Sequence, residues 1–326
     1  MNIFRKGQMS DQDIYRWLLD LRAHAHIPQS HFAVAVVFRA RCGGEEDYYF
    51  GGTNVENMDH HLSTHGEEGA ICSLVTALGK SAEIVEGWVI GAPDHIKPGD
   101  GSVAAGSIAS CCGRCRQQIA GFSAAGTKIH YFSLSGRMET TTVGEFLPQP
   151  FTFRQFIPDL VAIEKTGTAP PAADIEKRLI RKAPLSAAEI SDWLKGLESI
   201  DYVSKTSQSI VVELDNGFYA AGIKIEEASF SGAVNVARCA MAVATSAFGT
   251  QKVLNVWVYT CGRDEKKLPV GSFGTLPMSA LQVLFEFAKD ETLPVHYLGE
   301  DGLVVNKTLI TAAEIAPVSH RAFQKA

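Results

Sequence analysis

The sequence predicts an α/β protein in which a three-layer α/β/α domain with a mixed sheet is present twice, the second copy being degenerate. Three observations support this fold class. Apolar residues switch along the chain between the spacing of a helix and the alternation of a strand. The chain has 326 residues, 46% of them hydrophobic, which is enough for two domains. Matching residues also recur about 170 positions apart, as an internal repeat requires.

The beginning of the chain is predicted to form a helix followed by a hairpin. Ser10 precedes acidic residues that are typical of a first helical turn, and the apolar residues after it fall on one face: Ile14, Trp17, Leu18 and Leu21. Two strands are expected over residues 32–38 and 47–52, with a turn over 39–46 between them. This hairpin brings Asn54 and Glu56 to the edge of the sheet.

Helices and strands then alternate. The spacing of apolar residues predicts helices over 65–78 and 112–122, and apolar runs predict strands over 84–90 and 128–134. The first of these helices begins with His65 and Glu67, and the second begins with Cys112 and Cys115. A helix start offers free backbone amides and the positive end of the dipole, which lowers the cost of a negative charge on Glu67.

The residues at these two helix starts indicate a catalytic zinc site. His65, Cys112 and Cys115 supply one nitrogen and two sulfur ligands, which leaves the fourth tetrahedral position of Zn²⁺ for water. Glu67 is left unligated and can move protons as a general acid and base. Two thiolates and a neutral imidazole balance the charge of the dication, so Glu68 suits only a site that needs no compensating cation.

The spacing of these motifs resembles that of the cytidine deaminases. In chain order the motifs are Asn54-Val-Glu56, His65-Gly-Glu67, Cys112-Gly-Arg-Cys115 with Arg116-Gln117 after it, and a closing segment over 142–148. The histidine ligand and the long chain are similar to the dimeric, two-domain bacterial type. That resemblance implies a homodimer with one zinc site in each N-terminal domain.

The resemblance also implies a reaction. It is the hydrolytic deamination of cytidine or deoxycytidine to the uridine form and ammonia, carried out by a zinc-bound hydroxide with Glu67 as proton shuttle, in pyrimidine salvage. In the same family, residues at the positions of Asn54 and Glu56 hold the ribose 3′-hydroxyl of the nucleoside. Without a resemblance, both could simply be polar residues at the end of a hairpin.

The internal repeat divides the chain. Residue pairs that match at offsets of 176, 170 or 169 include Ser10 and Ser186, Trp17 and Trp193, Gly52 and Gly222, Glu56 and Glu226, Glu145 and Glu314, and Pro148 and Pro317. The positions opposite His65, Glu67 and Asn54 hold Asn235, Ala237 and Lys224, and residues 277–281, opposite the cysteine pair, contain no cysteine. The sequence therefore predicts a catalytic domain over 1–150, a linker over 151–184 that includes the Pro-rich segment 167–171, and a degenerate domain over 185–326.

Composition restricts the partners. The net charge is −6, the pI is about 5.9, and no basic run exceeds two residues, which favours a small neutral substrate over nucleic acid. No apolar run approaches the length of a membrane span and the first residues do not resemble a signal peptide, so a cytoplasmic protein without a membrane partner is expected. An odd cysteine count argues against a disulfide framework, and four cysteines are interpreted as small apolar fillers: Cys42, Cys72, Cys239 and Cys261.

Three residues compete with the predicted ligands. His60 and His61 are alternative nitrogen donors, but neither precedes a glutamate at the needed spacing, and we interpret both as solvated loop residues. Cys111 stands where the family has a proline. The Cys-x-x-Cys register favours Cys112 and Cys115 over it.

Residues 91–110 depart from the family, because they form a much longer connection between the strand and the cysteine pair. This insertion is either an inert surface excursion or a lid that changes which substrate enters, with Asp94 and His95 as its polar groups. Two further functions therefore stay open. One is deamination of another amidine, such as a modified nucleoside or a free base, and the other is non-catalytic nucleoside binding.

Overall fold

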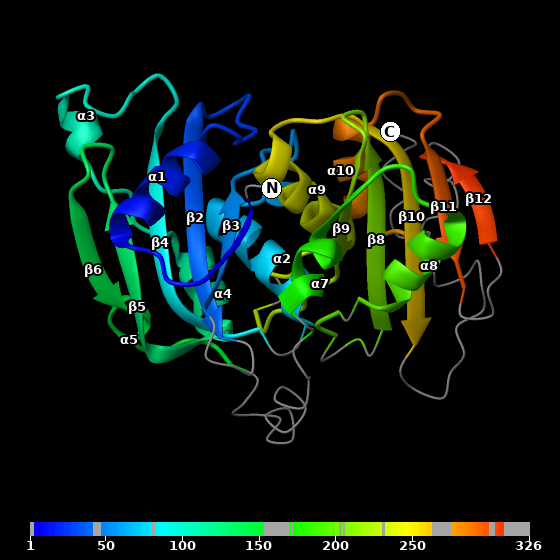
Figure 1. Ribbon diagram of the computed structural model, residues 1–326, viewed down its shortest axis with the longest axis horizontal. Coiled ribbons are helices and arrows are strands. Elements are labelled where there is room, and N and C mark those ends of the chain that lie inside the picture. Colours follow the sequence, from blue (N-terminus) through cyan, green and yellow to red (C-terminus); the bar gives the residue numbers. More distant parts are fainter. Residues whose placement is uncertain are drawn as a thin grey trace, which may run out of the picture.

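The structure is a computed structural model that describes residues 3–41, 47–79, 82–152, 170, 172–197, 199–201, 204, 206–229, 232–262, 275–299 and 304–309. It contains two six-stranded mixed sheets with helices packed between and around them (Figure 1). Residues up to 152 carry the first sheet and are called the first half below, and residues from 172 carry the second sheet and are called the second half. No described helix has both the length and the apolar character needed to span a membrane.

The first sheet has the strand order β1-β3-β2-β4-β5-β6. Its strands are β1 (Phe4–Lys6), β2 (Phe32–Arg41), β3 (Asp47–Thr53), β4 (Ile84–Pro93), β5 (Ser123–Phe132) and β6 (Met138–Thr142). The β4·β5 pair is parallel and the other neighbours are antiparallel. Because β3 and β4 both run antiparallel to β2, their carboxyl ends lie at the same edge of the sheet.

The second sheet repeats this order as β7-β9-β8-β10-β11-β12, again with one parallel pair, β10·β11. Its strands are β7 (Ile180–Lys182), β8 (Thr206–Leu214), β9 (Phe218–Ile223), β10 (Val253–Gly262), β11 (Pro294–Leu298) and β12 (Val304–Thr308). The shared order is the arrangement expected of two copies of one fold, and the prediction of an α/β fold with two mixed sheets is confirmed.

The helices of the first half are α1 (Asp11–Arg22), the 3₁₀ helix η1 (His60–Leu62), α2 (Gly66–Leu78), α3 (Val103–Gly106), α4 (Gly113–Gly121) and α5 (Val143–Phe146). Those of the second half are α7 (Ala172–Leu179), α8 (Ala187–Lys195), α9 (Val236–Phe248) and α10 (Met278–Phe287). Helices α2 and α9 contact each other in the space between the two sheets, near the centre of Figure 1.

Two consecutive glycines show that helices cover both faces of the first sheet. Side chains alternate between the faces of a strand. A Cβ placed on Gly51 would meet Leu21 of α1, whereas a Cβ placed on Gly52 would meet the backbone of Ala70 in α2. The first half is therefore layered as helix, sheet and helix.

The approach of α2 to β3 yields a stability prediction. A Cβ on Gly52 would lie 1.9 Å from the amide nitrogen of Ala70, and because this neighbour is backbone, no side-chain rotation relieves the clash. We expect Gly52→Ala to lower the free energy of unfolding by at least about 3 kcal/mol, the upper range for an overpacked core. Urea denaturation followed by circular dichroism measures the change. Gly126→Ala is the matched control, since a Cβ there meets nothing within 4 Å; equal stability of the two variants would contradict the expectation.

Several element boundaries differ from those expected. The turn expected from residue 39 is wrong for its first three residues, because β2 continues to Arg41. Arg39 can occupy a strand because Asp47 and Glu86 on the neighbouring strands pair with its guanidinium group at 3.2 and 2.8 Å. Strand β4 likewise extends to Pro93, into the range read as an insertion.

Some predictions fall on residues that are not described. Cys42, most of the segment 167–171, Glu314 and Pro317 lie outside the described residues. Within the range predicted as a linker, 151–184, the structure contains α7 and β7, and β7 pairs with β9 of the second sheet. The boundaries at 150 and 185 stay predictions.

Candidate active site

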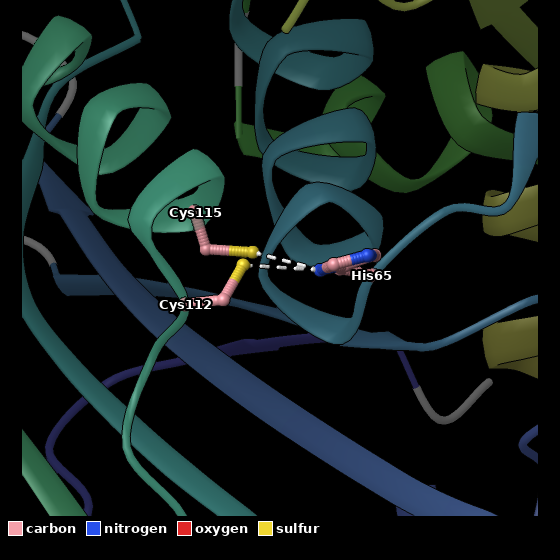
Figure 2. A group of neighbouring side chains, drawn as sticks. All are labelled: His65, Cys112 and Cys115. Carbon is pink, nitrogen blue, oxygen red and sulfur yellow. Dashed lines mark hydrogen bonds between the residues drawn. The ribbon is translucent and has the colours of Figure 1, made fainter. Parts of the chain in front are cut away.

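Three potential metal ligands meet where two helices begin. His65 is the N-cap of α2, Cys112 is the N-cap of α4, and Cys115 lies in the first turn of α4. The Nδ1 atom of His65 is 3.4 Å from Sγ of Cys112 and 3.3 Å from Sγ of Cys115. Figure 2 shows the two thiols and the imidazole converging on one point. Within the described part of the chain, no other group of three or more His, Cys, Asp or Glu residues could hold a metal ion.

Sheet topology explains why these helices meet. Helix α2 follows β3 and α4 follows β4 in the chain, and the carboxyl ends of these two strands lie at the same sheet edge. Ligand sites of open α/β sheets are built at this edge. Both N-cap residues have extended backbone angles, with φ −76° and ψ 163° at His65 and φ −71° and ψ 168° at Cys112.

The two thiols differ in acidity because they interact with each other. Hydrogen bonds with Cys115 and His65 lower the pKa of Cys112 to about 3. The pKa of Cys115 is raised, first by its bond to Cys112 and then by burial. The contact with Cys112 raises the pKa of His65. Cys112 is thus ready to act as a thiolate ligand.

This donor set fits Zn²⁺. Two sulfurs and one imidazole nitrogen are the ligand types that zinc takes in proteins, and their ligand atoms all lie within 4.8 Å of one another. Three protein ligands leave one tetrahedral position open, as in catalytic rather than structural zinc sites.

A cavity of about 420 Å³ opens onto this group. It is lined by Ser30, Phe32, Val34, Asn54, Glu56, His60, Ser63, Thr64, His65, Gly66, Glu67, Val89, Ala109, Ser110 and Cys112. The volume falls within the range of small-molecule pockets, about 300–1,000 Å³. Two of the three ligands and all three other predicted site residues therefore face one cavity, while Cys115 is buried beside it.

Glu67 lies in the first turn of α2, two residues after His65, and is only 5% exposed. Its neighbour is Cys111, whose pKa is raised by burial and then by the Glu67 carboxylate. Cys111 itself is buried and is not part of the metal-binding group. Glu67 is thus a buried carboxylate that lines the same cavity as His65 and Cys112, and a carboxylate there is chemically able to accept and donate protons.

Hydrogen bonds to backbone groups hold the side chains of Asn54 and Glu56 in place. The Asn54 side chain accepts a hydrogen bond from the Val34 amide at 2.9 Å and donates one to the Phe32 carbonyl at 2.8 Å. Oε2 of Glu56 accepts hydrogen bonds from the amides of Gln29 and Ser30 at 2.9 and 3.1 Å. Burial opposes ionisation of Glu56, but these hydrogen bonds prevail and its pKa is lowered, so the side chain is an ionised acceptor.

Glu68 has a more elaborate environment than the sequence indicated. It is fully buried, and its carboxylate bonds to Arg114 of α4 at 2.5 Å and to Arg238 of α9 at 3.1 Å. Burial alone would raise the pKa of Glu68, but the two guanidinium groups and the His65 amide hold that pKa below its usual value. The sequence did not indicate these cations: Arg114 and Arg238 both pair with Glu68 beside the ligand group.

The other candidates are separated by their positions. His60 lines the cavity and is exposed, whereas His61 is exposed and does not line it. From the insertion, Ala109 and Ser110 line the cavity. Asp94 and His95 do not; they lie on the surface, where Asp94 is 3.4 Å from the ring of His31.

The second half holds different residues at the corresponding places. Asn235 is the N-cap of α9, as His65 is of α2, and Pro277 is the N-cap of α10, as Cys112 is of α4. Lys224, opposite Asn54, pairs with Glu226 at 3.2 Å. The described residues of the second half contain no metal-binding group. Glu226, the counterpart of Glu56, is neutralised by Lys224.

Comparisons with known proteins point to one family at low identity. No family model matches the chain. It is 26% identical over 144 residues to a cytidine deaminase of Halalkalibacterium halodurans, covering 44% of this chain and 96% of that protein. It is 28% identical over 131 residues to a cytidine deaminase of Sporosarcina psychrophila, covering 40% of this chain and 83% of that one.

Solved structures of cytidine deaminases are also similar to part of the chain. That from Burkholderia pseudomallei is 24% identical with a TM-score of 0.36, over 44% of this chain and all of that one. That from Mycobacterium tuberculosis is 23% identical with a TM-score of 0.34, over 44% of this chain and 99% of that one.

Proposed function

We propose that this protein is a zinc-dependent hydrolytic deaminase that converts cytidine or deoxycytidine to the uridine form and ammonia. The observation that carries the proposal is the joint placement of His65, Cys112 and Glu67 around one cavity, with Cys115 completing the donor set. The low-identity relatives, which are cytidine deaminases, support the same reaction. They do so over less than half of the chain.

The residues divide the work between binding and proton transfer. His65, Cys112 and Cys115 would hold the metal, which when bound would supply a Lewis acid that lowers the pKa of a water molecule from 15.7 to about 7. The carboxylate of Glu67 accepts a proton from the attacking water, whose oxygen bonds to the amidine carbon of the substrate, and it passes that proton to the ring nitrogen. A second transfer through Glu67 protonates the departing amine, so one carboxylate acts as base and then as acid.

The sugar is proposed to lie at the Asn54 and Glu56 end of the cavity. Glu56 is ionised and can accept a hydrogen bond from a ribose hydroxyl. Asn54 uses one N–H and one oxygen lone pair for the backbone, and an amide side chain has a second of each for the sugar. Phe32, at the start of β2, provides an apolar wall against which a pyrimidine ring can pack. These assignments make the substrate a nucleoside rather than a free base.

This sugar site yields a prediction. Glu56→Gln keeps an oxygen for the Gln29 and Ser30 amides but loses the charged acceptor, so we expect kcat/KM for cytidine to fall about 10- to 150-fold, the value of one hydrogen bond to a charged group. The residual turnover or binding of cytosine should not change, because the base lacks the sugar. Glu139→Gln on the exposed β6 is the control. Equal losses for cytidine and cytosine would contradict the assignment of Glu56 to the sugar.

A second candidate function is deamination of a different amidine, and one observation favours it. Ala109 and Ser110 come from the insertion and line the cavity, so the wall of the pocket differs from the family pattern. Such a wall changes which ring fits without changing the proton chemistry.

Ammonia release from the purified, zinc-analysed protein tests both candidates. The substrates are cytidine, deoxycytidine, cytosine and a short single-stranded oligonucleotide. Turnover of the two nucleosides alone supports the proposal and a role in pyrimidine salvage. Zinc binding without turnover of any of the four overturns cytidine as substrate and favours another amidine, and absence of stoichiometric zinc overturns the catalytic proposal and favours non-catalytic nucleoside binding.

Four further features belong to the proposal. By resemblance to the two-domain bacterial type we propose a homodimer, and we also propose a cytoplasmic location. The acidic net charge of −6 supports a small-molecule substrate over a nucleic acid. We also propose that residues 1–150 form the catalytic domain and residues 185–326 a degenerate one.

A further inference from the structure

Glu68 joins the two helices that carry the metal ligands. Its Oε2 atom accepts the amide proton of His65 at 2.8 Å. Its Oε1 atom accepts hydrogen bonds from Arg114, which lies between the two cysteines, at 2.5 Å and from Gln118 at 2.8 Å. One carboxylate therefore bonds to the backbone of the first ligand and to the chain segment of the other two.

Arg238 reaches this carboxylate from the second half. Its Nη2 atom is 3.1 Å from both oxygens of Glu68 and 2.9 Å from the carbonyl of Ser63. The Arg238 residue is 4% exposed and Glu68 is 0% exposed, so the pair is shielded from water. Removing one partner of a buried ion pair is strongly destabilising, because the other charge is left uncompensated.

We propose that Arg238 of the degenerate second half is a positioning residue for the zinc site, acting through Glu68. This inference rests on the proposed function, because it assigns Glu68 and Arg238 to the support of the ligands His65, Cys112 and Cys115. The second half thus contributes to the site although it has lost the ligands themselves.

The positions of the two residues in the repeat support this assignment. Glu68 and Arg238 are 170 residues apart, the same offset that relates His65 to Asn235. They occupy corresponding places on α2 and α9, two helices that pack against each other. With identical residues in both copies, like charges would face each other there. Divergence of the second copy allows a glutamate in one half to face an arginine in the other.

Helix α4 is also bonded to the second half beyond Glu68. Nε2 of Gln117 donates to Oε1 of Glu227 at 2.9 Å, and Nε2 of Gln118 donates to the carbonyl of Gly232 at 2.5 Å. The helix that carries Cys112 and Cys115 is therefore bonded both to Glu68 and to the second half.

Loss of Arg238 should disturb the ligands through Glu68. When the buried Glu68 carboxylate loses one of its two cations, its free energy is lower if it turns toward water. In turning, it releases the His65 amide and Arg114. Residues that orient metal ligands typically change metal affinity about 10- to 100-fold when they are replaced. We expect a change of this size for Arg238→Met.

The experiment measures zinc affinity rather than turnover. Arg238→Met, Arg238→Lys and the double variant Glu68→Gln with Arg238→Met are titrated with Zn²⁺ against a chromophoric chelator, and their Co²⁺ absorption spectra are recorded. We expect weaker zinc binding and an altered Co²⁺ spectrum for Arg238→Met, and partial rescue for Arg238→Lys. The double variant should bind zinc more tightly than Arg238→Met because it leaves no poorly compensated carboxylate.

Thr76→Val is the matched control. Thr76 also joins the halves, through a 3.3 Å contact with Sγ of Cys239, but on α2 it lies more than two helical turns after Glu68. It should keep the zinc affinity of the parent protein. If Arg238→Met binds zinc as tightly as the wild type, or if Thr76→Val loses as much zinc affinity as Arg238→Met, this inference is overturned and the proposed function is not. If Arg238→Met does not fold, undiminished affinity in Arg238→Lys overturns it, whereas failure of the parent protein to bind zinc overturns the proposed function as well.

Discussion

Replacing Cys115 by alanine is expected to abolish both zinc binding and deaminase activity. The Cys115 thiol is buried and lies 3.3 Å from Nδ1 of His65, so no water molecule from bulk solvent takes its place without rearranging α4. Two remaining ligands, His65 and Cys112, form an incomplete set for Zn²⁺. Atomic absorption on the purified variant should find no zinc above background, and ammonia release should also fall to background.

A thermal measurement separates loss of the metal from loss of the fold. A ligand that binds only the native state stabilises it, by about 2.7 kcal/mol when its concentration is 100 times Kd. Added zinc should therefore raise the Tm of the parent protein and leave that of Cys115→Ala unchanged. Cys111→Ala is the control, since Cys111 is equally buried and adjacent in sequence but stands outside the ligand group. Zinc retained by Cys115→Ala and lost by Cys111→Ala would show that the ligands were assigned in the wrong register.

The fold class could be predicted because the internal repeat and the spacing of apolar residues are patterns that extend over many residues. Apolar spacing located α2 within one residue of its observed start, and the Cys-x-x-Cys motif located the start of α4 equally well. Strand β1 was missed because three residues are too few to display alternation. The end of β2 was missed because Arg39 resembles a turn residue until its partners Asp47 and Glu86 are known. The ligand set of the candidate site was predicted from local motifs alone.

The interactions between the halves could not be predicted from sequence. The sequence marked Glu68 only as a residue that suits a site without a compensating cation, and it assigned no role to Arg238. Their contact depends on how α2 packs against α9, which no local pattern encodes. One signal was present nonetheless: the two residues share the offset of 170, and packing of corresponding helices across a repeat brings corresponding positions together.

Glu67→Gln is expected to retain zinc and lose turnover, the opposite pattern from a ligand variant. Glu67 does not belong to the ligand group, and glutamine has the same shape, so the metal site should stay intact. The amide cannot accept the proton of water or return it to the substrate. General acid–base catalysis contributes about 10²- to 10⁴-fold for one proton transfer. Because Glu67 is assigned more than one transfer, kcat should fall by the upper end of that range or more.

Substrate affinity distinguishes this expectation from a simple disruption of the pocket. If Glu67 only moves protons, the variant should bind cytidine about as well as the parent protein, and calorimetry with the slowly turned-over substrate would measure that binding directly. Asn54 and Glu56 keep their backbone contacts in the variant, since none of these contacts involves Glu67. Near-normal turnover in Glu67→Gln would show that another group carries the protons. Loss of zinc would instead assign Glu67 to the metal, because a residue that only shuttles protons has no part in holding the ion.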